Sequence, residues 1–413
     1  MDGSSELPHT TKARISFITS LPPFKGISAY SVPLLQALGN RADLNIEAVA
    51  FKRLYPSKLY PGGSPVDPTL TMPSLGNVRV NNSLDGLNPA SWLHSAFALR
   101  GSVIHAQWWS QILAPAYLTL LCAARLRGKK VLLTVHNVSA HEPALWKRIA
   151  DRSVMALVDH FIVHTSENAQ ALARIVPNAV GRISIIPMGP EAGEVTGLSK
   201  AEARLRLNVA RDDRVILFFG NIRPYKRLDV MLEAFESLLF RIPRARLFVV
   251  GQPWAGSAEV DAAILRARRR PGVSLKTGYV PQADVETYFA AADLVACPYS
   301  GFEAQSGAAS TAVAYGKALV VSRSGGLVNF VQDQRAIVQP GDPASLAAAC
   351  EAILSGARLR RKLELDSARI AKSFSWDNIA QETAQVYFRL LSQTSEAPAP
   401  SAAKPTAKLG PAD

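Results

Sequence analysis

Two segments in the second half of the chain place charged or small residues directly after apolar, strand-like runs. The first, VILFFGNIRPYKRLD at 215–229, contains Gly220 and then Arg223 and Lys226, which are three residues apart. The second follows the apolar run DLVACPYS and reads GFEAQSGAAS at 301–310. Open α/β sheets bind ligands at the carboxyl ends of their strands. The two segments are therefore expected to line one pocket.

A nucleoside diphosphate is the ligand that suits this pair of segments. Arginine binds two phosphate oxygens through its planar fork, and lysine supplies a compact charge. Small residues from Gly307 to Ala314 let a helix begin close to the ligand, with its free N–H groups directed at phosphate. Glu303 places a carboxylate beside them. The alternatives are an ordinary solvated loop for the two cations and a helix-flanking role for Glu303.

Apolar strand-like runs alternate with helix-period segments along both halves of the 413-residue chain. Examples are RISFIT, KVLLTVH and HFIVHT in the first half, and RVILFFG, RLFVVG and ALVVS in the second. This alternation is typical of parallel sheets covered by helices on both faces. Two such series predict an α/β protein with two Rossmann-like, doubly wound domains that face each other.

The domain boundary is expected where the chain loses strand character and gains glycines, before a charged helix. We expect an N-terminal extension at 1–12, a first domain at 13–190 and a second domain at 191–373. The segment 374–392 is amphipathic and predicts a helix, which is expected to cross back onto the first domain. The Pro/Ala-rich segment 393–413 predicts a disordered tail.

Three histidines in the first half of the chain are candidates for the functional site, and each has a different interpretation. His136 ends the strand-like run KVLLTVH, so it is expected at the carboxyl edge of the first sheet. Its near-neutral pKa suits hydrogen bonding to sugar hydroxyls; the alternative is a core histidine bonded to backbone. His141 follows in a loop, where a surface position and a role on the acceptor side are both open. For His105, which ends another strand, a structural role is favoured.

The chain is basic, since 46 Lys and Arg minus 33 Asp and Glu gives a net charge of +13. This excess favours anionic partners: nucleotide phosphates, an anionic membrane surface or nucleic acid. No recognition helix or aromatic-basic platform supports nucleic-acid binding. The three cysteines have apolar or small neighbours and no paired spacing, so buried, reduced thiols of a cytosolic protein are expected. No apolar run is long enough to predict a membrane-spanning helix.

The sequence gives no indication of a bound metal or cofactor. No Asp-x-Asp element follows a strand, and the histidines lack the spacing of metal ligands. No strand leads into Gly-x-Gly-x-x-Gly, so a nicotinamide enzyme is not indicated. Arginine and lysine are expected to take the place of a metal in stabilising a diphosphate.

Three segments are rich in basic residues: 124–130 (ARLRGKK), 144–152 (ALWKRIADR) and 266–270 (RARRR). In the first two segments, the basic residues lie beside Leu or Trp. They are either solvated helix faces or sites that dock on anionic lipid, where each cation near the surface contributes about 1 kcal/mol. The second reading would suit an enzyme whose acceptor is a lipid-linked sugar.

Across residues 13–392 the chain resembles retaining glycosyltransferases of the GT-B fold, family 4. That family holds the donor diphosphate with Gly-x-x-x-x-x-Lys after the first strand of its second domain, and Gly220 and Lys226 match this element. The basic residue that commonly follows the glycine is Asn221 here, and Arg223 resembles its replacement. The loop around Gly26, in SLPPFKGISAY, resembles the family's first-domain loop, whose backbone N–H groups approach donor and acceptor; a tight turn without a ligand is the alternative.

The family's Glu-x7-Glu element maps onto Glu303 and, eight residues later, Thr311. The first carboxylate lies against the donor sugar in the family and is kept here. The second, which usually holds the nucleotide ribose, is lost. Gln305, Ser306 and Gly307 resemble a known variant of the element, which indicates divergence of a subgroup. The family's glutamate after the Gly-Gly pair is Asn329 here, a further departure.

The resemblance implies a metal-independent enzyme that moves a hexose-type sugar from a nucleoside diphosphate to an acceptor hydroxyl, with retention. It implies donor binding by Gly220, Arg223 and Lys226 and by the segment from Glu303 to Thr311, and sugar contacts by His136 and Glu303. The acceptor is expected to be a saccharide or a lipid-linked saccharide in polysaccharide or glycoconjugate synthesis, in the cytoplasm or at the inner face of the membrane. A non-catalytic sugar-nucleotide-binding scaffold and a nucleotide-sugar epimerase are the alternatives.

Overall fold

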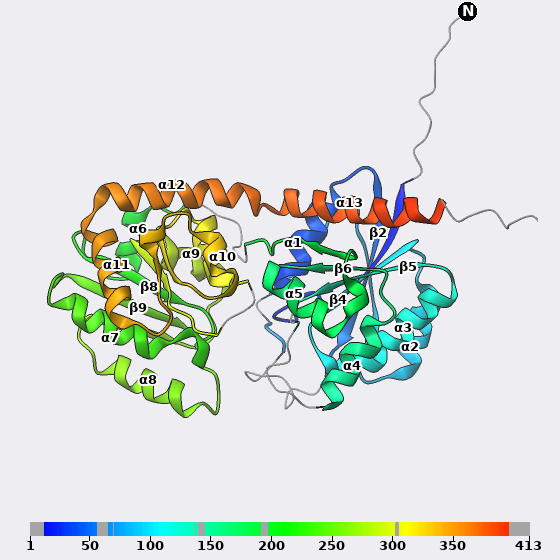
Figure 1. Ribbon diagram of the computed structural model, residues 1–413, viewed down its shortest axis with the longest axis horizontal. Coiled ribbons are helices and arrows are strands. Elements are labelled where there is room, and N and C mark those ends of the chain that lie inside the picture. Colours follow the sequence, from blue (N-terminus) through cyan, green and yellow to red (C-terminus); the bar gives the residue numbers. More distant parts are fainter. Residues whose placement is uncertain are drawn as a thin grey trace, which may run out of the picture.

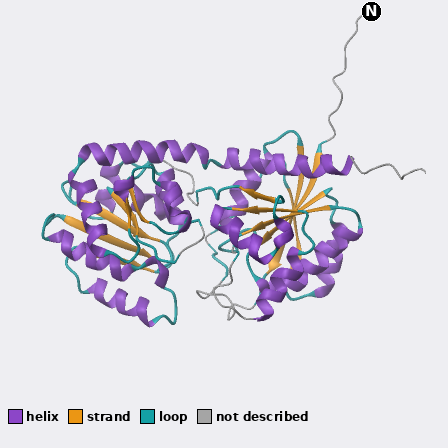
Figure 2. Cartoon of the chain, viewed as in Figure 1, coloured by secondary structure: helices purple, strands orange, loops and turns teal. Residues whose placement is uncertain are grey.

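The computed structural model describes residues 12–55, 65–68, 70–136, 138, 145–190, 197–301 and 305–395. Each of two domains has a parallel sheet at its centre with helices on both faces (Figure 2). The domains lie side by side, and two long helices run end to end along one side of both (Figure 1). These features confirm the predicted α/β class with two Rossmann-like domains.

The first domain contains a seven-stranded sheet in the order β3-β2-β1-β4-β5-β6-β7. The strand order reverses between β1 and β4, which are parallel neighbours in register from Ile15 opposite Val103. The strands are β1 Ala13–Thr19, β2 Leu44–Arg53, β3 Arg79–Asp85, β4 Val103–Trp108, β5 Lys130–Val135, β6 His160–Val163 and β7 Ile183–Ile185. The helices are α1 Ser28–Gly39, α2 Pro89–Ala98, α3 Ala114–Leu126, α4 Leu145–Met155 and α5 Ser166–Ile175.

The second domain contains a six-stranded sheet in the order β10-β9-β8-β11-β12-β13, so its order reverses between β8 and β11. The strands are β8 Arg214–Phe219, β9 Ala245–Gly251, β10 Val273–Thr277, β11 Leu294–Cys297, β12 Leu319–Ser322 and β13 Ile337–Val338. The helices are α6 Lys200–Arg206, α7 Leu228–Leu239, α8 Ala258–Arg268, α9 Gln282–Ala291, α10 Gly307–Ala314, α11 Pro343–Ser355, α12 Ala357–Ser373 and α13 Trp376–Ser395.

Helix α13 belongs to the core of the first domain although it follows the second in sequence. Its apolar face packs with α1, and Tyr387 is fully buried there. The Tyr387 hydroxyl lies 2.7 Å from Nδ1 of His105 on β4. The expected crossing of the C-terminal helix back onto the first domain is therefore confirmed (Figure 1). The helix extends to Ser395, beyond the expected end at 392.

Two further expectations can be compared with the structure. Cys297 and Cys350 are buried, but Cys122 on α3 is exposed, so the prediction of buried thiols is wrong at that position. Its neighbours in the sequence are apolar or small, but its own position on the helix is exposed. None of the helices within the described ranges combines the length and apolar character that crossing a bilayer requires.

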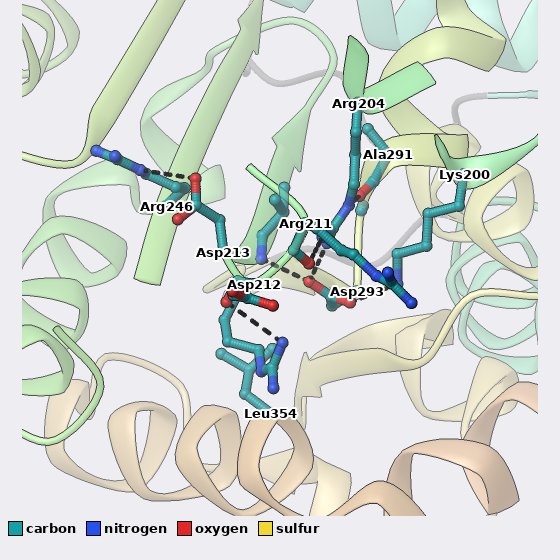
Figure 3. A network of polar contacts seen from close by, with 12 residues as sticks. Lys200, Arg204, Arg211, Asp212, Asp213, Arg246, Ala291, Asp293 and Leu354 are labelled. Atoms are coloured by element: carbon teal, nitrogen blue, oxygen red, sulfur yellow. Dashed lines mark hydrogen bonds and ion pairs between the residues drawn. The ribbon is translucent and has the colours of Figure 1, made fainter. Parts of the chain in front are cut away.

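A buried acidic residue, Asp293, holds together the amino-terminal ends of strands β8 and β11 in the second sheet. Asp293 precedes β11 and accepts from the backbone N–H of Val215 and from Nη2 of Arg204, both at 2.7 Å (Figure 3). Lys200 forms an ion pair with its other oxygen. These partners hold the pKa of Asp293 below its ordinary value against the opposing effect of burial. The contacts join α6, β8 and β11.

We expect Asp293→Ala to lower the free energy of unfolding of the second domain by about 3–5 kcal/mol, because Arg204 is left buried without its carboxylate. Denaturant unfolding measures this change. Asp212→Ala is the matched control, since the Asp212 side chain is 73% exposed in its ion pair with Arg244. Equal losses in the two variants would contradict a structural role for Asp293.

Candidate functional site

The turn after β8 depends on a residue without a side chain. Gly220 has a φ of +96°, and a Cβ at this position would lie 2.8 Å from Nζ of Lys226. That ammonium group donates to the carbonyl of Phe219 at 3.1 Å, and Lys226 is only 6% exposed. The glycine thus leaves room for a positive charge to lie against the carboxyl end of the strand.

The same charge lies beside the beginning of α10. A Cβ on Gly220 would lie 4.0 Å from Cβ of Ala308 in the first turn of that helix. Nζ of Lys226 lies 5.3 Å from the ring centroid of Tyr299, a buried residue of the loop after β11. Ser306 lies 3.4 Å from the Tyr299 hydroxyl and caps α10, accepting from the N–H of Ala309 at 3.2 Å.

The structure therefore brings Gly220, Lys226, Ser306 and Gly307 together at the carboxyl edge of the second sheet. A buried ammonium group and the N-terminus of a helix both favour an anion. In Figure 1, α10 lies on the side of its domain that faces the first domain. The sequence predicts a diphosphate pocket at this edge, and the binding of a diphosphate here stays a prediction.

Arg223 has a partner that the sequence reasoning missed. Its guanidinium carbon lies 4.1 Å from the ring centroid of Trp254, a distance at which a cation and an aromatic face attract each other. The N–H of Trp254 donates to the carbonyl of Ile222 at 3.0 Å, which joins the loop after β9 to the loop after β8. The signal was available: an aromatic residue in a loop at the same sheet edge as Arg223.

Two residues assigned to donor binding direct their polar atoms elsewhere in this structure. The amide of Gln305 accepts from the N–H of Met188 at 2.6 Å and donates to the carbonyl of Met188 at 2.7 Å. Gln305 thereby joins the beginning of α10 to the segment that links the two domains. The hydroxyl of Thr311 donates to the carbonyl of Gly307 at 2.8 Å, within its own helix.

Gly26, on the facing side, lies in a loop that contacts the second domain. It has a φ of +78° and lies at the N-terminal end of α1. The N–H of Lys25 donates to the carbonyl of Pro65 at 2.8 Å, which holds the loop in place. Nζ of Lys25 lies 5.0 Å from the ring centroid of Tyr279 in the second domain. The Gly26 loop thus lies at the interface between the domains, as the resemblance in the sequence implies.

His136 also lies at the predicted edge, but its ring is engaged with protein groups. Its Nε2 lies 2.7 Å from Oε1 of Gln107, and its Nδ1 lies 3.1 Å from Nε2 of His164. Its ring contacts that of Tyr30 edge-on, at 4.7 Å between centroids. The sequence reasoning missed both His164, which directly follows β6, and Gln107, which lies in the last part of β4. Both strands neighbour β5, so these residues meet His136 at one edge. A sugar hydroxyl would have to displace one of these partners.

The hydrogen bonds fix which ring nitrogens carry protons. Nδ1 of His164 lies 2.9 Å from the carbonyl of Ile186, so it donates and Nε2 accepts from Nδ1 of His136. Burial lowers the pKa of His136 well below its ordinary value and the pKa of His164 to about 4, so both rings are neutral near pH 7. Nε2 of a neutral His136 is then an acceptor, and the Gln107 amide must turn its NH2 group toward it.

His105 has the structural role that the sequence favours. Its side chain is fully buried, with Nε2 2.7 Å from the hydroxyl of Thr134 and Nδ1 bonded to Tyr387 of α13. Burial lowers its pKa to about 3. His141 and Glu303 lie outside the described residues, so the structure does not place either of them.

A cavity of about 220 Å³ lies between the domains, beside this site. Asn329, at the position of the family's glutamate, is one of its lining residues. The others are His164, Thr165, Ser166, Ile185 and Pro187 from the first domain, and Gln305, Gly326, Phe330 and Phe374 from the second. Within the described ranges, no group of three or more His, Cys, Asp or Glu side chains is arranged to hold a metal ion.

The neutral histidines predict acid sensitivity. Between pH 6.5 and about 4, the unfolded chain protonates His164 but the folded chain does not, so stability falls as the pH falls through this window. At pH 5 the loss from this one residue is about 2 kcal/mol relative to pH 7. His164→Gln should reduce by this amount the difference in free energy of unfolding between pH 7 and pH 5. An unchanged difference would show that His164 is protonated in the folded protein.

Residues 213–356, which form most of the second domain, match a family described as "Glycosyl transferases group 1". The chain is 30% identical over 271 residues to a D-inositol 3-phosphate glycosyltransferase from a Nocardioides species, covering 62% of this chain and 59% of that protein. The match thus spans less than two thirds of the relative's own length.

Solved structures resemble the whole fold. Sucrose-phosphate synthase from Thermosynechococcus elongatus superposes with a TM-score of 0.69 at 19% identity, over 92% of this chain and 100% of that chain. HepE from Anabaena, solved with UDP and glucose, gives a TM-score of 0.69 at 16% identity, over 91% of this chain and 100% of that chain. At these identities the likeness establishes the fold alone. The GT-B fold expected from the sequence is therefore confirmed, and residues 213–356 match the group 1 glycosyltransferase family.

Proposed function

We propose that this protein is a retaining glycosyltransferase that moves a hexose-type sugar from a nucleoside diphosphate to a saccharide or lipid-linked saccharide. One observation carries the proposal. The ammonium group of Lys226 and the N-terminus of α10 converge at the carboxyl edge of the second sheet, within the segment that matches the family. Such a site stabilises negative charge that develops on a departing diphosphate.

In the proposed reaction, the bond between the anomeric carbon and the diphosphate oxygen breaks while its electrons pass to the diphosphate. Lys226, Arg223 and the first N–H groups of α10 stabilise the departing charge. An oxocarbenium-like centre forms, as in other glycosyl chemistry. The acceptor oxygen then bonds to that carbon from the same face, and its proton passes to the departing phosphate. No protein group has to take up that proton permanently.

His136 and Glu303 are proposed to orient the sugar. For His136 this requires a change from the described structure, because both of its ring nitrogens have protein partners. Gln107 is the partner we propose to be exchanged for a sugar hydroxyl, since the bond to His164 continues to the carbonyl of Ile186 and fixes the ring. The part proposed for Glu303 rests on the resemblance. Closure of the two domains would exclude water, which competes with the acceptor.

For the acceptor and the location, we propose only a chemical class and a compartment. The relative's name, D-inositol 3-phosphate glycosyltransferase, suggests a phosphorylated polyol as one acceptor to test. The notion of a lipid-linked acceptor rests on the basic segments of the first domain. An enzyme of this kind would act in the cytoplasm or at the inner face of the membrane, in polysaccharide or glycoconjugate synthesis, without a metal or other cofactor.

The direct test is a panel of UDP-, GDP- and ADP-sugars, with release of the nucleoside diphosphate measured in the presence of excess chelator. We expect release with at least one donor, increased by an acceptor. Tight binding without release for every donor would favour the non-catalytic scaffold. Release that depends strictly on a divalent metal would reject the proposed cation site, and a product epimeric to the donor sugar would identify an epimerase.

Lys226→Ala is expected to lower turnover by roughly 10²–10³-fold while the protein stays folded, because a charge that stabilises the leaving group is lost. Steady-state kinetics with the active donor measures the change, and circular dichroism monitors the fold. Arg244→Ala, at an exposed arginine of the same domain, is the matched control and should keep normal turnover. Normal turnover by the Lys226→Ala, Arg223→Ala double variant would refute the diphosphate site.

Trp254→Ala is expected to weaken affinity for the nucleoside diphosphate through its effect on Arg223. A cation–π contact contributes about 0.5–2 kcal/mol, so the loss should be roughly 2- to 30-fold. The same substitution in an Arg223→Ala background should have little effect, and Trp254→Phe should restore part of the affinity. Calorimetric titration of all four variants measures the coupling. Equal losses in both backgrounds would show that Trp254 acts independently of Arg223.

A further inference from the structure

Helix α4 exposes an unusual number of large apolar side chains for a surface helix. Leu145 is 71% exposed, Trp146 is 52% exposed and Ile149 is 56% exposed. All three lie in the first two turns of the helix. Its opposite face is anchored in the first domain through Val154 and Met155, which are fully buried. The exposed residues are therefore not needed to attach α4 to the sheet.

Positive charge surrounds these apolar residues. Lys147, Arg148 and Arg152 lie on the same helix, and both Arg148 and Arg152 are exposed. The only acidic residue of α4, Asp151, is buried and accepts from Nε1 of Trp108 at 2.9 Å. Among its own residues, α4 thus exposes apolar groups and cations, while its one carboxylate is buried.

The basic residues of the other two segments differ from those of α4 because they are bonded to other parts of the protein. In 266–270, Arg266 and Arg270 form ion pairs with Glu236, which partly neutralises them. In 124–130, Arg125 forms an ion pair with Asp159, and Arg127 and Lys129 donate to backbone carbonyls. These cations have structural partners.

The position of α4 relates this face to the proposed site. The helix begins nine residues after His136, which ends β5 at the carboxyl edge of the first sheet. Because α4 runs back toward the start of β6, its first turns lie at that edge and its last turn lies at the other. The exposed apolar residues are those of the first turns. In Figure 1, α4 lies on the opposite side of the molecule from α12 and α13.

We propose that the outer face of α4 docks the protein on an anionic lipid bilayer. An amphipathic helix with Trp and aliphatic residues among basic residues lies in the plane of the interface, with its apolar side chains among the acyl chains. Cations beside them gain from the negative surface potential of anionic lipid. A purely acidic protein partner would not need the three apolar groups, and an apolar contact between two copies would place like charges together.

This proposal deepens the proposed function without depending on it. A bilayer at α4 would present a lipid-linked acceptor next to the carboxyl edge of the first sheet. Docking can be measured on the full chain with no sugar nucleotide present. Its failure would leave donor binding intact, and failure of sugar transfer would leave docking intact.

The test is sedimentation of the protein with vesicles of phosphatidylglycerol and phosphatidylcholine, compared with phosphatidylcholine alone. We expect binding to the mixed vesicles only, and weaker binding at high salt. Arg148→Glu with Arg152→Glu should lower the partition coefficient roughly tenfold or more. Leu145→Ser with Ile149→Ser should also lower it, which an electrostatic contact without insertion would not do.

The matched control is Arg358→Glu with Arg361→Glu on α12, which makes the same change in net charge at exposed positions on the other side of the molecule. This variant should bind the mixed vesicles nearly as well as the unchanged protein. Equal losses in the α4 and α12 variants would overturn the proposal, because only net charge would matter. Equal binding to neutral vesicles would also overturn it, as would self-association of the unchanged protein that the α4 substitutions abolish.

Discussion

The site depends on a space that only glycine leaves open. At the end of β8 the backbone takes a left-handed φ at Gly220, and Nζ of Lys226 occupies the volume that a side chain there would need. The carbonyl of Phe219 and the ring of Tyr299 hold the ammonium group in this place. A charge that is nearly buried, yet faces the beginning of α10, is costly unless an anion or polar groups compensate it. The surrounding residues hold the Lys226 side chain in position and supply polar groups that offset the cost of burying its charge.

Both ends of the second sheet contribute to this arrangement. At one edge, Asp293 joins β8, β11 and α6, so the two strands that lead to the site are fixed relative to each other. At the other edge, Gln305 joins the beginning of α10 to the linker at Met188. Because α13 returns to the core of the first domain, the linker and this helix both connect the candidate phosphate site to the facing domain. A movement of one domain relative to the other would therefore shift the beginning of α10.

The parts of this arrangement that could be predicted from sequence are local. The strand-like runs identified both sheets, and Gly220, Lys226 and Ser306 lie within short segments that follow strands. The missed residues act through long-range contacts. Trp254 reaches Arg223 because β9 neighbours β8, and His164 reaches His136 because β6 neighbours β5. Sequence order gave no sign that Gln305 would bond to Met188, which lies 117 residues away. Such pairings follow from strand order, which alternating patterns do not specify.

The most direct measurement of the central claim is a crystal structure of the protein with bound UDP or GDP. The account predicts that the diphosphate lies at the carboxyl edge of the second sheet, with oxygens within hydrogen-bonding distance of Nζ of Lys226 and of the first N–H groups of α10. A nucleotide bound elsewhere, with Nζ of Lys226 still donating to the carbonyl of Phe219 and no phosphate within its reach, would contradict it.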